Sequence, residues 1–379
     1  MKLIHLSDLH LGKRINEYSM LEDQEFILEK IIGIIDAEKP DGVIIAGDIY
    51  DKSIPPAEAV TLFDWFLSAL ASKKLHVFII SGNHDSAERI AFGSRIMDAS
   101  GIHLSPVYDG KVPPITLSDK FGEVNFYLLP FVKPANVRRF YDNENIASYT
   151  DAIQCAVSHM SVNIEKRNVL VTHQFVTDAI RSESEDVSVG GTDNVNAAVF
   201  EPFDYVALGH LHRPQNCSSE KIRYCGTPLK YSFSEARDKK SVTIVELGAK
   251  GSLSVRETPL VPMRDMVEIK GKYNDIMQKS YYENTTYQDD YTHITLTDEE
   301  DIVDAIGKIR TVYRNLMKLD YDNTRTRTTA LIDGATDVET KSPLELFSDL
   351  YELQNNQPVS DEQKEFVQKL IEQIWEDGQ

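Results

Sequence analysis

Cysteine is scarce in this chain of 379 residues, which contains only Cys155, Cys217 and Cys225. Their number is odd and no two of them have the spacing C-x-x-C, which argues against a disulfide framework and against a cysteine-based zinc site. We therefore expect three reduced thiols without a role in chemistry.

Long apolar runs are also missing from the sequence. The longest ones, such as 43–46 and 77–80, are far too short to cross a bilayer. The first residues lead directly into a strand-like segment, without the apolar stretch and small-residue cleavage site of a signal peptide. These absences predict a cytoplasmic protein that does not enter a membrane.

Basic residues are fewer than acidic ones: the chain has 40 Lys and Arg and 60 Asp and Glu. The formal net charge is therefore -20. Taken alone, this argues against nucleic acid as a ligand, since phosphates are bound by cationic side chains. Part of the excess lies in residues 337–377, where eleven acidic residues face three lysines. Carboxylates that bind divalent cations are also neutralised when the metal is bound.

The pattern of apolar residues predicts an α/β fold followed by smaller parts. Strand-like runs alternate with helical periodicity over the first part of the chain, which is typical of layered α/β proteins. We expect strands at 3–7, 42–46 and 76–80, and helices at 20–37, 55–71 and 88–97. Beyond 262, a strand at 266–270, a strand at 292–297 and a helix at 302–316 indicate a small α+β domain. We expect two amphipathic helices at 343–353 and 361–375.

Five short polar motifs follow expected strands, where the loops of α/β proteins usually carry the functional residues. They are Asp8-Leu9-His10, Gly47-Asp48, Gly82-Asn83-His84-Asp85, His173 and Gly209-His210-Leu211-His212. Any one histidine is more often structural than metal-binding, but the five motifs together favour a metal site. Carboxylate, imidazole and amide ligands without thiolate suit Mn²⁺, Fe²⁺ or Zn²⁺ better than Ca²⁺.

Seven ligands are enough for two metal sites if one ligand bridges them. We expect one metal on Asp8, His10, Asp48 and His212, and the other on Asp48, Asn83, His173 and His210. Two such cations activate a water molecule and stabilise the charge on a phosphate ester undergoing in-line attack. His84 is then free to protonate the leaving oxygen as a catalytic residue, with Asp85 orienting its imidazole.

These motifs resemble the calcineurin-like metallophosphoesterase superfamily over roughly residues 1–260. A narrower resemblance, to the bacterial SbcD nuclease subunit family, covers the whole chain. It is carried by four segments, which are 4–12, 46–51, 81–86 and 226–235. The resemblance implies a layered β-sandwich metallophosphoesterase domain flanked by helices (1–260), a capping DNA-binding α+β domain (263–335) and a C-terminal helix pair that binds a partner ATPase (340–379).

The SbcD resemblance also implies an activity and partners. The expected activity is Mn²⁺-dependent cleavage of DNA, as an exonuclease on double-stranded ends and an endonuclease on single strands or hairpins, in DNA repair, recombination and replication. The expected partner is an SbcC-type coiled-coil ATPase, in a heterotetramer built on a homodimer of the nuclease subunit. Archaeal and eukaryotic relatives have a second histidine after the Gly-Asp motif, where this chain has Asp51 and Lys52, so that histidine's role does not transfer.

Further residues have less specific signals. Arg89 and Lys230 lie beside the motifs and are expected to contact DNA phosphates, although ordinary solvated charges have the same pattern. The helix at 55–71 is apolar on more than one face, which fits a dimer surface or a neighbouring helix equally. Apolar residues of the C-terminal helices are expected to bind the partner; they are Phe347, Leu350, Leu370 and Ile374.

Two other functions share these motifs. A phosphomonoesterase, a cyclic-nucleotide phosphodiesterase or a protein phosphatase has the same metal chemistry, but such enzymes do not need the parts beyond residue 262. A non-enzymatic adaptor that keeps the fold for binding is disfavoured by the complete ligand set and by the presence of His84.

Overall fold

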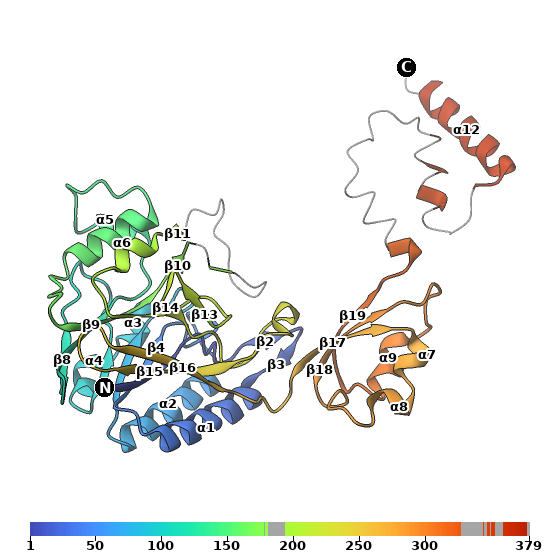
Figure 1. Ribbon diagram of the computed structural model, residues 1–379. Coiled ribbons are helices and arrows are strands. Elements are labelled where there is room, and N and C mark those ends of the chain that lie inside the picture. Colours follow the sequence, from blue (N-terminus) through green and yellow to red (C-terminus); the bar gives the residue numbers. More distant parts are fainter. Residues whose placement is uncertain are drawn as a thin grey trace. The chain divides into compact units, whose positions relative to one another are not determined.

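The computed structural model describes residues 1–177, 179–180, 194–326, 344, 347–348, 350–352 and 359–376. The chain divides into two compact units, Met1–Met266 and Val267–Gln379. Figure 1 shows the first unit in blue to yellow and the second in orange to red.

Two six-stranded sheets form the first unit, with the orders β16-β15-β1-β4-β5-β6 and β13-β14-β12-β9-β8-β7. The strands of the first sheet are β1 (Lys2–Leu6), β4 (Gly42–Ala46), β5 (His76–Ile80), β6 (Ile102–Leu104), β15 (Ser241–Leu247) and β16 (Leu253–Pro259). Those of the second are β7 (Ile115–Asp119), β8 (Gly122–Leu128), β9 (Arg167–His173), β12 (Tyr205–Gly209), β13 (Gln215–Cys217) and β14 (Ser219–Tyr224). Two small ribbons pair β2 (Arg14–Ile15) with β3 (Tyr18–Ser19), and β10 (Phe175–Val176) with β11 (Asn194–Val195).

The central strands of both sheets are parallel, as in β1–β4–β5 and in β8–β9–β12. The two sheets pack face to face through apolar side chains, and the rings of Phe78 and Phe126 stack across the interface with centroids 4.0 Å apart. Because these strands are buried on both sides, they read as continuous apolar runs, as in Val43-Ile44-Ile45. The parallel strands therefore end together in loops at one edge of each sheet.

Helices cover both outer faces of the sandwich. Figure 1 shows α1 (Leu21–Glu38) and α2 (Ala57–Ser72) on one side, and α5 (Pro134–Arg138) and α6 (Tyr149–Ser158) on the other. Two short helices, α3 (Ala87–Ile90) and α4 (Ser94–Asp98), and the 3-10 turns η1 (Ala197–Phe200) and η2 (Phe233–Glu235) complete the unit. The layered α/β sandwich expected from the sequence is present.

Two helix predictions were wrong in their bounds. The single helix expected at 88–97 is interrupted at Gly93, whose φ of 74° lies in the left-handed region that glycine adopts without strain. The helix expected at 302–316 ends at Arg310, because Leu316 already pairs with Thr292 in a parallel ladder. Tertiary pairing thus decides the conformation of a segment whose local pattern favours a helix.

The second unit contains the three-stranded sheet β17-β18-β19, formed by Met266–Gly271, Tyr291–Leu296 and Asn315–Tyr321. Helices α7 (Tyr273–Ile276), α8 (Lys279–Tyr282) and α9 (Ala305–Arg310) accompany it, and Ile294, Ile309 and Tyr313 lie in its core. A separate helix, α12, spans Asp361–Glu376. Within the described parts of the chain, no helix is both long and apolar enough to span a membrane.

Candidate metal centre

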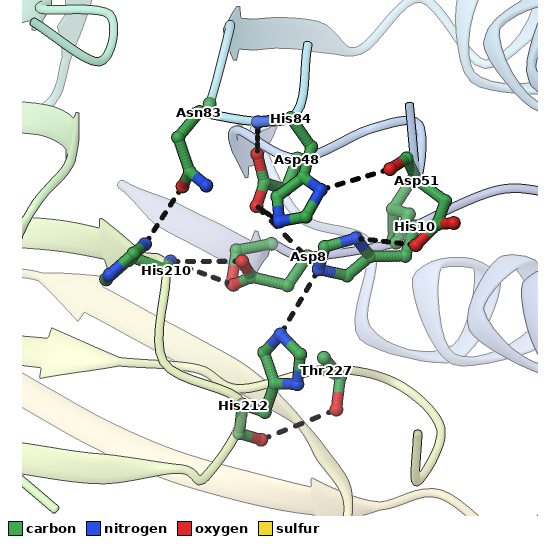
Figure 2. A network of polar contacts seen from close by, with 12 residues as sticks. Asp8, His10, Asp48, Asp51, Asn83, His84, His210, His212 and Thr227 are labelled. Carbon is green, nitrogen blue, oxygen red and sulfur yellow. Dashed lines mark hydrogen bonds and ion pairs between the residues drawn. The ribbon is translucent and has the colours of Figure 1, made fainter. Parts of the chain in front are cut away.

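The seven expected metal ligands lie at the carboxyl ends of strands from both sheets. Asp8, His10, Asp48 and Asn83 come from the loops after β1, β4 and β5 of the first sheet, and His173, His210 and His212 come from the ends of β9 and β12 of the second. Figure 2 shows how six of them face one another together with His84. The structure therefore assembles side chains that are up to about two hundred positions apart in the sequence.

Short interatomic distances join the candidate ligands into two groups. In one group, His10 Nε2 lies 3.2 Å from His212 Nε2 and 3.7 Å from Asp48 Oδ2. In the other, Asn83 Oδ1 lies 3.0 Å from His173 Nε2 and 2.9 Å from His210 Nδ1. Asp48 belongs to both groups, since its Oδ2 is also 3.3 Å from His173 Nε2.

The donor atoms fit divalent cations. Carboxylate oxygens and imidazole nitrogens that could hold one ion lie within 4.8 Å of one another in three overlapping sets. The sets are Asp8, His10 and His212; His10, Asp48 and His84; and Asp8, Asp48 and His173. Two imidazole nitrogens only 3.2 Å apart beside a carboxylate are what a cation with nitrogen and oxygen ligands requires.

The candidate ligands have unusual backbone conformations. Asp8, His10, Asp48 and His210 have φ values of 52°, 44°, 49° and 103°, which residues other than glycine rarely adopt. Hydrogen bonds between the two loops hold this geometry, because Asp8 N donates to the Gly47 carbonyl and His10 N to the Asp48 carbonyl, each at 3.0 Å. Such strain concentrates at functional sites, where the surrounding structure maintains it.

Glycines allow the loops to approach one another closely. A Cβ at Gly82 would collide with the carboxylate of Asp48, and a Cβ at Gly209 would collide with the carbonyl of Ala46. Gly82 and Gly209, which precede candidate ligands, are therefore needed for the space between the loops.

Burial and neighbouring charges shift the pKa values of the carboxylates in the centre. The side chains of Asp8 and His173 are 0% exposed and that of Asp48 is 2% exposed. Burial, together with nearby Asp48, raises the pKa of Asp8 to about 6, although His173 opposes the shift. Burial would also raise the pKa of Asp48, but the charge and hydrogen bond of His173, together with the charges of His10 and His84, outweigh burial and hold that pKa well below its usual range. The centre therefore concentrates negative charge on Asp48, the carboxylate shared by both groups.

His84 faces the same centre from the loop after β5. Its Nε2 lies 3.9 Å from Asp48 Oδ2, and its Nδ1 lies 3.0 Å from the carbonyl oxygen of Asp51. Asp85 was expected to orient this ring, but its carboxylate accepts hydrogen bonds from the backbone amides of Ile49, Tyr50 and Gly82 at 2.9–3.1 Å. These contacts favour a different role for Asp85, which ties the two loops together, and they make Asp51 the residue that orients His84.

Two residues support the centre in a way that the sequence did not indicate. Gln24 of α1 is 1% exposed, and its Nε2 donates to the His10 carbonyl at 2.7 Å while its Oε1 accepts from Gly12 N at 3.0 Å. Tyr231 donates to the Leu9 carbonyl at 2.6 Å. Tyr231 lies in the segment 226–235 that carries the SbcD resemblance, so a signal was present, whereas Gln24 looks like an ordinary polar residue of a helix.

The expected contact residues have different environments. Arg89 is exposed on α3, four positions after Asp85. Lys230 is 11% exposed, and its Nζ lies 2.8 Å from Asp265 Oδ1 and 2.6 Å from the Ala236 carbonyl. These contacts give Lys230 a role within the fold and weaken the prediction that it binds phosphate.

Of the residues expected to bind a partner, those whose side chains the structure describes are exposed. Phe347, Leu350 and Leu370 are 38%, 51% and 40% exposed, respectively. Ile374 belongs to α12, but its side chain lies outside the described residues. The expected contact of these residues with an ATPase stays a prediction.

Comparisons with known proteins place the chain in a family. The family model for calcineurin-like phosphoesterases matches residues 1–214, and a model described as the type 5 capsule protein repressor C-terminal domain (SbcD_C) matches residues 262–355. The SbcD subunit of nuclease SbcCD from Staphylococcus saprophyticus is 31% identical over the full length of both chains. That of Staphylococcus epidermidis is 33% identical over 84% of this chain and 85% of the relative.

The chain belongs to the SbcD family of nuclease subunits. This membership confirms the expected SbcD resemblance, the calcineurin-like fold and the classification as a metal-dependent nuclease that hydrolyses phosphodiesters. A dimetal phosphatase from Danio rerio is among the similar solved structures, with a TM-score of 0.42 and 13% identity over 69% of this chain and 96% of that one.

Proposed function

We propose that this chain cleaves DNA by a two-metal mechanism, with Mn²⁺ as the preferred cation. The observation that carries the proposal is the convergence of seven ligand side chains from two sheets on one centre, with Asp48 shared by both groups. Asp8, His10, Asp48 and His212 would hold one ion, and Asp48, Asn83, His173 and His210 the other. When bound, two divalent cations supply activation of water and stabilisation of the charge on the phosphate.

The protein's own side chains perform the remaining steps. The carbonyl of Asp51 fixes Nδ1 of His84, so that Nε2 faces the centre next to Asp48. From this position, His84 can give a proton to the leaving oxygen of the sugar as a general acid. The buried carboxylates of Asp8 and Asp48 hold the two groups of ligands in place, and the exposed Arg89 is available to a phosphate of the bound strand.

We also propose that the chain acts as an exonuclease on double-stranded DNA ends and as an endonuclease on single strands or hairpins. It would do so within an SbcC–SbcD type complex in the cytoplasm. The names of the curated relatives support the partner, since they are subunits of a complex called SbcCD. The exposed apolar side chains of Phe366 and Leu370 on α12 support a docking role for that helix.

The dimer expected for the nuclease subunit is likewise a proposal. One face of α2 packs within the unit through Leu62, Phe63 and Phe66, which are at most 8% exposed. On the same helix, Val60 and Trp65 remain 44% and 40% exposed. These two exposed apolar side chains mark the surface that we assign to the second copy of the chain.

A nuclease assay with two substrates tests the proposal. Labelled linear and hairpin DNA would be compared with bis-p-nitrophenyl phosphate in the presence of Mn²⁺, using wild type and Asp48→Ala. We expect the wild type to cut DNA and the variant to cut neither substrate. Cleavage of the generic diester without any cleavage of DNA, even with an SbcC-type ATPase present, would leave the metal chemistry intact and reject the nuclease function.

A further inference from the structure

A buried carboxylate from a residue outside the expected ligand set restrains His212. Glu235 is 0% exposed, and its Oε1 lies 3.5 Å from Nδ1 of His212. The opposite ring nitrogen, Nε2, faces His10 Nε2 at 3.2 Å in the candidate metal centre. Glu235 therefore contacts the side of the imidazole that points away from the candidate metal centre, which is where ligating histidines usually donate a hydrogen bond to a carboxylate.

A buried lysine connects Glu235 to the backbone of the same histidine. Nζ of Lys240, whose side chain is 4% exposed, lies 2.5 Å from Glu235 Oε2 and donates to the His212 carbonyl and to Thr227 Oγ1, each at 2.8 Å. Thr227 N also donates to the His212 carbonyl, at 3.1 Å, and Figure 2 shows Thr227 beside that carbonyl. One ion pair thus restrains His212 at its ring and at its backbone.

An ion pair in this position is a poor way to gain stability. Removing both charges from water costs about as much as their attraction returns, so a well-packed apolar pair of the same volume would serve the fold equally well. What the pair provides instead is a defined position for the two groups that it contacts, Nδ1 and the carbonyl oxygen of His212.

We propose that Glu235 and Lys240 are positioning residues for His212. Glu235 keeps the proton of the neutral imidazole on Nδ1, which leaves the lone pair of Nε2 for the metal ion, and Lys240 fixes Glu235 against the His212 carbonyl. This inference rests on the proposed two-metal function and deepens it for the ion that is held by Asp8, His10, Asp48 and His212.

Isothermal titration with Mn²⁺, on the full-length chain and without DNA, tests this inference. In Glu235→Gln we expect the affinity of one binding event to fall by about 10- to 100-fold, the usual effect of losing such a carboxylate partner, while the other event is unchanged. In a His212→Asn background, the same substitution should cause no further loss, because Glu235 acts through His212.

Folding of the variants is controlled in two ways. Glu235→Met combined with Lys240→Met removes both buried charges with little change in volume, so it avoids an unpaired ammonium and should show the same loss of Mn²⁺ affinity. Asp119→Asn is the matched control. It breaks another ion pair, between Asp119 and the buried Arg167, and is expected to lower stability without changing the Mn²⁺ isotherm.

The outcomes separate this inference from the proposed function. Folded Glu235 variants with wild-type Mn²⁺ isotherms would overturn the positioning role, even if wild type cuts DNA. A further loss of affinity in the His212→Asn background would do the same. Conversely, the expected losses in a protein whose wild type binds Mn²⁺ but cuts no DNA, even with an SbcC-type ATPase present, would support the positioning role and reject the nuclease function.

Discussion

Oδ1 of Asp48 accepts a hydrogen bond from the backbone amide of His84 at 2.9 Å. The carboxylate expected to bridge the two metals therefore also fixes the loop of the expected proton donor. Its other oxygen, Oδ2, lies 3.3 Å from His173 Nε2 and 3.7 Å from His10 Nε2. A change at this one residue affects both metal groups and the position of His84 at the same time.

Substitution of Asp48 by asparagine separates these roles. Asparagine keeps an oxygen that accepts from His84 N but loses the charge that the cations require. We expect nuclease activity to fall on the order of a thousand-fold, because several kcal/mol of charge stabilisation are lost. Thermal unfolding of the metal-free protein should change little. Mn²⁺ stoichiometry equal to that of wild type would contradict the bridging role.

His84→Gln should leave metal binding intact and slow the reaction. A general acid typically contributes about 10²- to 10⁴-fold to the rate, so we expect kcat to decrease by that order while Mn²⁺ titration remains as in wild type. Single-turnover cleavage of labelled DNA measures the effect. If the variant retains the wild-type rate, His84 does not donate the proton.

Gly82→Ala tests the close approach of the loops at the centre. The added Cβ would collide with the Asp48 carboxylate, so we expect Mn²⁺ binding and DNA cleavage to be lost together. Gly33→Ala is the matched control, because Gly33 lies in α1 with no atom near the added Cβ. Alanine there should raise the free energy of unfolding by up to about 1 kcal/mol. Equal Mn²⁺ affinities in the two variants would refute the steric argument.

Gln24→Ala should destabilise the loop that carries His10. The side chain of Gln24 hydrogen-bonds the His10 carbonyl, Gly12 N and the Tyr231 hydroxyl. Loss of these buried partners should reduce the free energy of unfolding by about 1–3 kcal/mol, as measured by urea denaturation. Tyr231→Phe removes the contact with Gln24 and the hydrogen bond to the Leu9 carbonyl, which is fewer hydrogen bonds than Gln24→Ala removes, and is expected to cost less. A Gln24 variant as stable as wild type would show that solvent replaces the side chain.

The ion pair between Asp119 and Arg167 predicts a loss of stability in acid. The hydrogen bonds from Arg167 hold the pKa of Asp119 well below its ordinary value of 3.8. A carboxyl group whose folded-state pKa is depressed stabilises the fold above the unfolded-state pKa. This contribution is lost progressively as the pH falls from the unfolded-state pKa through the folded-state pKa. Urea midpoints between pH 7 and pH 2 should therefore decrease less steeply below pH 4 in Asp119→Asn than in wild type. Parallel curves would rule out this contribution.

Much of the fold and of the site could be predicted from the sequence, because the signals were local. Strands such as 42–46 and 76–80 are continuous apolar runs, and their bounds match β4 and β5. The ligand motifs directly follow such strands, so their convergence was expected. β14 was missed because its first half, Ser219–Lys221, is polar and partly exposed at one side of the sheet.

The supporting contacts could not be predicted, because they depend on pairs that are distant in sequence. Nothing near Gln24 indicates that it reaches Tyr231, which lies 207 positions later. Asp85 was assigned to its neighbour His84, yet its oxygens accept from Ile49 and Tyr50 in another loop. Adjacency in sequence does not indicate these partners of Asp85, because the loops that meet at the centre come from different strands.

The division of the ligands between the two sheets has a consequence for synthesis on the ribosome. Asp8 and Asp48 are made early, but their partners His210 and His212 follow only after more than half of the chain has been translated. β1, which positions Asp8, also pairs with β15, whose residues are later still. A chain that ends before His212 thus lacks a complete hydrolytic centre, and the ability to cut a phosphodiester arises only when the strands of both sheets have been made and paired.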